Sequence, residues 1–131
     1  MPERFRADVI RPIGRGGEAT VYELTGRRAL RVYHRQPHDA GRLAAFYREI
    51  AHGTTTFALP EVIEQGQDGG IAYSVDRLID GRPLDALLPR LHRIERERAL
   101  ASYCDAAFEI AALPCNRSAY GEFLRDDDAI H

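Results

Sequence analysis

Three glycines stand within four positions near the start of the chain, at Gly14, Gly16 and Gly17. They come directly before "ATVYEL" (19–24), a run rich in β-branched and aromatic residues that predicts a strand. Two interpretations compete. The first is an ordinary hairpin turn. The second is a loop whose backbone N–H groups approach a ligand such as a phosphate, because glycine has no Cβ to obstruct the contact.

Two charged residues further along the chain could complete a phosphate site. Arg31 lies in the next strand-like run, and Glu49 lies in a segment with helical periodicity. A cation on the adjacent strand can balance phosphate charge, and a carboxylate on a packed helix can hold that cation in position. The simpler alternatives are a surface arginine on an edge strand and a solvated helix carboxylate. If the loop faces a phosphate, we expect Arg31 and Glu49 to meet between strand and helix.

The elements that must position these residues follow from the residue patterns. Strands are predicted at 9–14, 19–24, 28–33, 61–65 and 71–79, with a turn at 66–70. Pro12 indicates an edge position for the first strand, because proline cannot donate to a neighbouring strand. Apolar residues at helical spacing predict one helix over about 39–53, with Asp39 as its N-cap and Gly53 as its stop.

Only helices are predicted after this region. One is expected at 83–93, broken or kinked at Pro89, and a longer one from about Ile94 to Leu113, ended by Pro114. The predicted fold class is therefore α+β: a five-stranded antiparallel sheet over residues 4–80 with one helix packed across it, followed by helices.

Composition excludes several function classes. The 131 residues are 44% hydrophobic and 29% charged, typical of one globular domain or a piece of a larger one. The net charge of −2 gives no basic field for nucleic acid. No signal peptide or membrane-spanning run is present, so we expect no membrane partner and a cytoplasmic location. Cys104 and Cys115 lack metal-ligand spacing, and the histidines are expected to be solvated or capping residues.

Four stretches, in order, resemble one known family. "GRGGEATV" (14–21) resembles the kinase pattern G-x-G-x-x-G-x-V, with Ala19 at the third glycine and Val21 in place. "ALRV" (29–32) resembles the strand with the phosphate-pairing lysine, Arg31 standing at the lysine position. Glu49 stands where the family's ion-pairing glutamate lies, and "VDRLIDGRPLDALL" (75–88) resembles the hinge segment. Residues 9–113 thus resemble the N-terminal lobe of the protein-kinase-like fold, including the aminoglycoside phosphotransferase group of small-molecule kinases.

The resemblance implies a domain plan and a ligand. Residues 1–80 would form a kinase-like nucleotide-binding N-lobe, and 81–131 the hinge exit and the helical start of an incomplete C-lobe. The ligand would be ATP with Mg²⁺. The implied site residues are Gly14, Gly16, Gly17 and Val21 at the phosphates, Arg31 paired with them, Glu49 orienting Arg31, and Val75, Asp76, Arg77 and Leu78 at the adenine.

The sequence also departs from the family. Arg31 keeps the charge of the lysine but has a larger, planar head. No His-x-Asp catalytic loop occurs in the sequence. We therefore expect the ATP-binding portion of a phosphotransferase with an unknown acceptor, inactive alone and ending before the catalytic half. The alternative is a non-catalytic, pseudokinase-like interaction module. The expected partners are a nucleotide and either a missing C-lobe or a second copy of the chain, with Leu100, Tyr103 and Ala107 partly uncovered.

Overall fold

The computed structural model describes residues 1–37 and 40–115, so the predicted N-cap Asp39 lies outside the described residues. The fold is α+β, as predicted. In chain order the elements are η1 (Glu3–Phe5), β1 (Val9–Arg15), β2 (Ala19–Leu24), β3 (Arg28–Tyr33), α1 (Ala40–Ile50), β4 (Val62–Asp68), β5 (Ile71–Arg77), α2 (Leu84–Leu87), η2 (Leu88–Arg90) and α3 (Arg93–Ala111).

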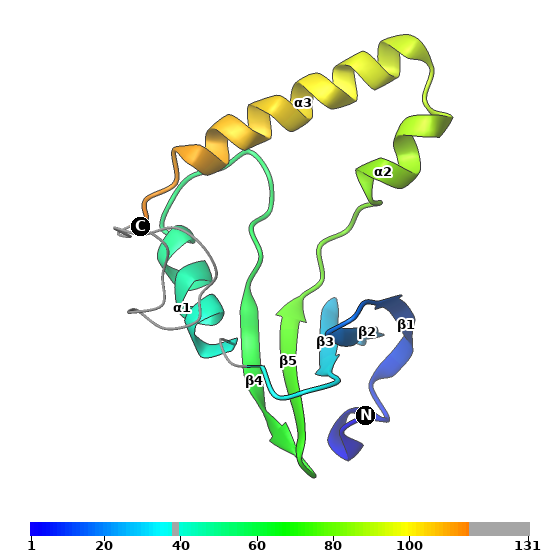
Figure 1. Cartoon of the computed structure of the whole chain (residues 1–131), viewed down its shortest axis with the longest axis vertical. Helices are drawn as coiled ribbons and strands as arrows, with labels where there is room; N and C mark the ends of the chain where they lie inside the picture. The colour runs from blue at the N-terminus through cyan, green and yellow to red at the C-terminus, as the bar shows by residue number, and fades with distance from the viewer. Residues whose placement is uncertain (38–39, 116–131) are drawn as a thin grey trace.

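The strands form one five-stranded sheet in the order β1-β2-β3-β5-β4, with every neighbouring pair antiparallel. β1 is an edge strand, which confirms the prediction from Pro12. Because β3 and β4 flank β5 and run parallel to each other, the chain needs a crossover connection between them. α1 provides it and packs beside β4, at the edge of the sheet (Figure 1).

The β4–β5 hairpin differs from the prediction at both ends. β4 continues to Asp68, and the turn is formed by Gly69 and Gly70 alone, whose φ angles are 56° and 79°. Two consecutive residues with positive φ make a tight turn that matches the twist of the strands, so both strands extend closer to the turn than the predicted 66–70 loop allows. β5 ends at Arg77, two residues earlier than predicted.

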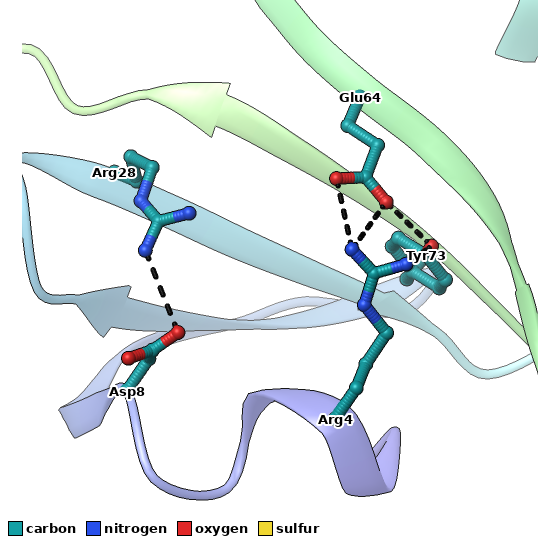
Figure 2. Close-up of polar contacts among 5 residues, drawn as sticks. All are labelled: Arg4, Asp8, Arg28, Glu64 and Tyr73. Carbon is teal, nitrogen blue, oxygen red and sulfur yellow. Dashed lines mark hydrogen bonds and ion pairs between the residues drawn. The ribbon is translucent and has the colours of Figure 1, made fainter.

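The hydrophobic core lies on one face of the sheet. Its buried members are Leu24, Leu30, Val32, Tyr73 and Val75 from the strands and Phe5 from η1. The N-terminal segment closes this face through polar contacts (Figure 2). Arg4 donates to the Tyr73 hydroxyl at 3.0 Å and lies 2.9 Å from Glu64 Oε1, and Asp8 pairs with Arg28 at 3.5 Å. These contacts attach the N-terminal segment to β3, β4 and β5 on this face.

The helical region follows the predicted breaks. α2 gives way to the 3-10 turn η2, which contains Pro89, and α3 ends at Ala111, before Pro114. The C-terminal end of α3 returns to the segment after α1 (Figure 1), where Thr56 Oγ1 donates to Glu109 Oε2 at 2.9 Å. Gly53 is needed at this junction, because a Cβ there would lie 2.6 Å from Leu113 Cδ2.

Much of the surface of α3 is uncovered. The exposed fractions reach 63% for Tyr103, 76% for Phe108 and 56% for Ile110. Leu100, at 44%, and Ala107 are exposed as well, as expected from the sequence. Within the part of the chain that the structure describes, no helix has the length and apolar character needed to cross a membrane.

Candidate functional site

Three of the predicted site residues lie side by side across the sheet. Gly14 of β1 is opposite Val21 of β2, Val21 is opposite Arg31 of β3, and Arg31 is opposite Ser74 of β5. Residues directly opposite each other in a sheet project from the same face. Leu30 and Val75 are partners in the core, so the row of Gly14, Val21, Arg31 and Ser74 occupies the face opposite the core.

The backbone angles bear on the question raised by the glycine cluster. Gly26, Gly69 and Gly70 have positive φ, whereas Gly14, Gly16 and Gly17 do not. A Cβ built on any of the latter three meets no atom within 4 Å among the described residues. Neither turn geometry nor packing therefore requires glycine at these positions. The backbone at these glycines is open to close approach from outside.

His34, which follows β3, forms hydrogen bonds with the tip of this glycine turn. The Gly16 N–H donates to Ala19 O at 2.9 Å, which closes the turn. His34 Nδ1 lies 3.1 Å from Gly17 O, its Nε2 lies 2.9 Å from the Thr20 hydroxyl, and its backbone N–H donates to Glu18 O at 2.8 Å. This contact was not predicted from the sequence. Its signal is the position of His34 directly after β3, because β3 pairs antiparallel with β2, the strand that follows the turn.

Two backbone donors at the turn tip are unused. Within residues 1–37 and 40–115, no group accepts a hydrogen bond from the N–H of Gly17 or of Glu18. Consecutive backbone N–H groups in a turn can form an anion-binding concavity. The turn thus offers donors as well as room for close approach.

Arg31 pairs with Asp76 of β5, with 3.2 Å between NH2 and Oδ2. The sequence analysis instead expected Glu49, which is half-buried near the C-terminal end of α1. The reason is the strand order: β5 lies next to β3, and Asp76 is two residues along from Ser74, the direct partner of Arg31. A diagonal neighbour on the same face is within reach of a long side chain. Nothing in the residue pattern indicates that β5 lies beside β3.

Each member of this pair keeps a buried atom without a hydrogen-bond partner among the described residues, Nε of Arg31 and Oδ1 of Asp76. Buried polar atoms in folded proteins are nearly always hydrogen-bonded to protein or to water. The side chains remain 44% and 18% exposed. The unpartnered Nε and Oδ1 are themselves buried, so the exposed part of the pair consists of other atoms of the two side chains.

A hollow of about 480 Å³ lies between the first hairpin and the segment that leaves the sheet; it is lined by Arg11, Pro12, Ile13, Glu23, Leu78, Ile79, Asp80 and Gly81. Glu23 is opposite Ala29, two residues from Arg31, so the hollow opens on the same face as the glycine–arginine row. The leaving segment is fixed by Arg27, whose carbonyl accepts from Leu78 N–H at 2.9 Å and whose side chain pairs with Asp80.

The four predicted adenine residues do not stay together. Asp76 faces Arg31 and Leu78 lines the hollow, but Val75 is 1% exposed in the core on the other face. Its side chain therefore does not line this hollow, because neighbouring strand residues point to opposite faces, and the adenine role of these residues stays a prediction. Arg77 pairs with Glu61 at 3.6 Å and borders a separate hollow of about 650 Å³ beside α1. That larger hollow contains no other predicted site residue.

No cluster of three or more His, Cys, Asp or Glu side chains suited to a metal ion occurs among the described residues.

Comparison with known proteins identifies no relative: no family model matches the chain, and no curated protein matches it.

Proposed function

We propose that this chain is the ATP-binding portion of a kinase-like phosphotransferase, with the phosphates held between the glycine turn and Arg31. One observation carries the proposal. Glycine at positions 14, 16 and 17 is required neither by backbone angle nor by packing, yet the cluster begins the row that leads to Arg31. A ligand that approaches the backbone closely accounts for both facts.

We assign each part of the nucleotide to a region of this proposed site. The free N–H groups of Gly17 and Glu18 would donate to phosphate oxygens, and Arg31 would supply the cation. The base would occupy the hollow beside Leu78. Since the described residues form no metal cluster, Mg²⁺ would take phosphate oxygens and water as its main ligands here. Holding the phosphates in a fixed position is the main contribution that such a lobe makes to phosphoryl transfer.

The order of elements also supports the resemblance to the kinase-like fold. The glycine turn joins the first two strands, the cation is on the third, one helix separates the third strand from the fourth, and a connecting segment leaves the fifth. The sequence contains no His-x-Asp motif, so the proposal covers nucleotide binding by this chain and leaves the phosphate acceptor open.

A second candidate function is a non-catalytic interaction module. It is favoured by one observation, the apolar side chains that α3 exposes, among them Tyr103 and Phe108. Large exposed apolar surfaces usually mark contacts with other proteins. The two functions differ in a simple way, because only the first requires the chain to bind Mg-ATP.

Calorimetric titration with Mg-ATP tests the proposal. We expect binding by the unmutated chain and a loss of about 1–3 kcal/mol in Arg31→Ala, since a charge-assisted hydrogen bond is removed. Arg31→Lys should bind as well as the unmutated chain or better. The double change Gly16→Ala and Gly17→Ala should weaken binding without lowering the stability of the fold, because the added methyl groups meet nothing.

Gly69→Ala is the matched control. Its φ of 56° should make alanine cost about 1 kcal/mol of stability, while binding stays unchanged because the β4–β5 turn is outside the site. If the unmutated chain gives no heat with Mg-ATP, the nucleotide function is refuted. If Arg31→Ala binds as well as the unmutated chain, the cation is elsewhere.

A further inference from the structure

We infer that His34 is a positioning residue for the phosphate donors of the glycine turn. The inference rests on the proposed function and deepens it: His34 would not touch the nucleotide but would fix the direction in which the Glu18 N–H points. The residue stands directly after β3, next to the turn between β1 and β2.

Three contacts attach His34 to the turn. Its Nδ1 lies 3.1 Å from Gly17 O, and because a carbonyl can only accept, the hydrogen in this bond is on Nδ1. Its Nε2 contacts the Thr20 hydroxyl at 2.9 Å, and its backbone N–H donates to Glu18 O at 2.8 Å. The imidazole is thereby held at both ring nitrogens, and it holds the Gly17 carbonyl toward β3.

The direction of one carbonyl determines the direction of one donor. In a trans peptide the C=O and N–H groups point in opposite directions, and all peptide bonds in the described chain are trans. The peptide between Gly17 and Glu18 has its oxygen on His34, so its N–H, which belongs to Glu18, points away from His34. This N–H has no acceptor among the described residues and is free to donate to a ligand.

Without the imidazole no described group would hold this peptide through a hydrogen bond. Gly17 has no side chain to limit rotation, and no other described group bonds its carbonyl. The β2–β3 hairpin does not depend on the imidazole, because these two strands are paired through their backbones from Ala19–Tyr33 to Leu24–Arg28. His34 is also exposed, so its ring contributes little to the core. What the ring adds is a fixed orientation of one peptide plane.

The test compares three probes and three variants by calorimetry: Mg-ATP, inorganic triphosphate with Mg²⁺, and adenosine. His34→Leu should bind Mg-ATP and triphosphate about tenfold more weakly, the effect expected when a hydrogen bond to a charged group is misdirected. Adenosine binding and the urea midpoint should not change. His34→Asn keeps an N–H at the same number of bonds from the backbone and should restore most of the phosphate affinity. Thr20→Val, which removes only the Nε2 contact, is the matched control and should behave nearly as the unmutated chain.

The outcomes separate the inference from the function on which it rests. If the unmutated chain binds neither Mg-ATP nor triphosphate, both are refuted. If it binds them and His34→Leu binds them equally, the function stands and the positioning role is refuted. An equal loss for adenosine, or a lower urea midpoint, would make the role of His34 merely structural. If His34→Leu does not fold, His34→Asn decides alone: a tenfold loss of triphosphate binding in a stably folded Asn variant would overturn the inference.

Discussion

Neutralising Asp76 should raise the affinity of the chain for phosphate while lowering its stability. In the structure Asp76 already occupies one side of the Arg31 guanidinium, at 3.2 Å. A phosphate that binds Arg31 must compete with this carboxylate for the same cation. Asp76→Asn removes the competing charge but keeps the size and hydrogen-bonding capacity of the side chain, so Arg31 becomes available without a cavity.

The magnitude follows from the exposure of the pair. Ion pairs between solvent-exposed side chains contribute about 0.2–1 kcal/mol. Arg31 is 44% exposed and Asp76 only 18%, which puts the pair near the upper end of that range. If the Arg31–Asp76 ion pair contributes about 1 kcal/mol, removing it should raise the affinity for Mg-ATP roughly fivefold. Loss of the same ion pair should lower the free energy of unfolding by about 1 kcal/mol.

Both quantities can be measured on one protein sample, the affinity by calorimetric titration and the stability by urea unfolding. Glu61→Gln is the matched control. It removes the same charge from another arginine–carboxylate pair, Arg77–Glu61 at 3.6 Å, which lies away from the glycine turn. The control corrects for the change in net charge, so only the excess effect of Asp76→Asn belongs to Arg31.

Asp76→Asn should change affinity and stability in opposite directions: affinity for Mg-ATP should rise and the free energy of unfolding should fall. If Asp76→Asn binds Mg-ATP more weakly than the unmutated chain, the carboxylate helps to bind the nucleotide and does not compete with it. If Glu61→Gln gains as much affinity as Asp76→Asn, the effect comes from net charge alone and the ion pair is irrelevant.

Two further predictions concern other parts of the molecule. Because α3 exposes Leu100 and Tyr103, we expect the unmutated chain to dimerise in light scattering and Leu100→Glu with Tyr103→Glu to be monomeric; a monomeric unmutated chain at high concentration would contradict this. The hydrogen bond to Glu64, together with burial, raises the pKa of the Tyr73 hydroxyl above its ordinary value of 10.0. The folded state then holds this proton more tightly than the unfolded state, so the free energy of unfolding should fall as the pH rises above about 10. Tyr73→Phe should remove that dependence and cost about 1 kcal/mol at neutral pH, measured by urea unfolding, and a slope that persists in Tyr73→Phe would refute the assignment.

The local features of this fold could be predicted from the sequence because local chemistry determines them. Pro12 marked an edge strand, Pro89 interrupted the helical region, and Pro114 followed the end of α3. The hairpin turn at Gly69 and Gly70 was placed too broadly, since the composition of 66–70 does not show which residues have positive φ.

The partners of the site residues could not be predicted, because they depend on which strands become neighbours. Arg31 lies on a strand as predicted, and its pairing with Asp76 was not foreseen, since nothing in the residue pattern puts β5 next to β3. The sequence predicts His34 as a solvated or capping histidine, and its contacts with Gly17 and with Thr20 of β2 depend on strand pairing that the residue pattern does not show. Val75 was assigned to the ligand face because a list of consecutive hinge residues ignores the alternation of side chains along a strand.

The junction between α3 and the segment after α1 has a mechanical consequence. The chain leaves the sheet at Leu78, whose N–H donates to Arg27 O, and the end of α3 comes back to the segment between α1 and β4 (Figure 1). There Thr56 donates to Glu109. An arm attached at one point can swing in any direction, whereas one attached at two points can only rotate about the line through both. The two contacts therefore restrict the motion of α3 relative to the sheet more than the chain connection at Leu78 would alone. A change at Gly53, where a Cβ would meet Leu113, would release one attachment and with it the restriction.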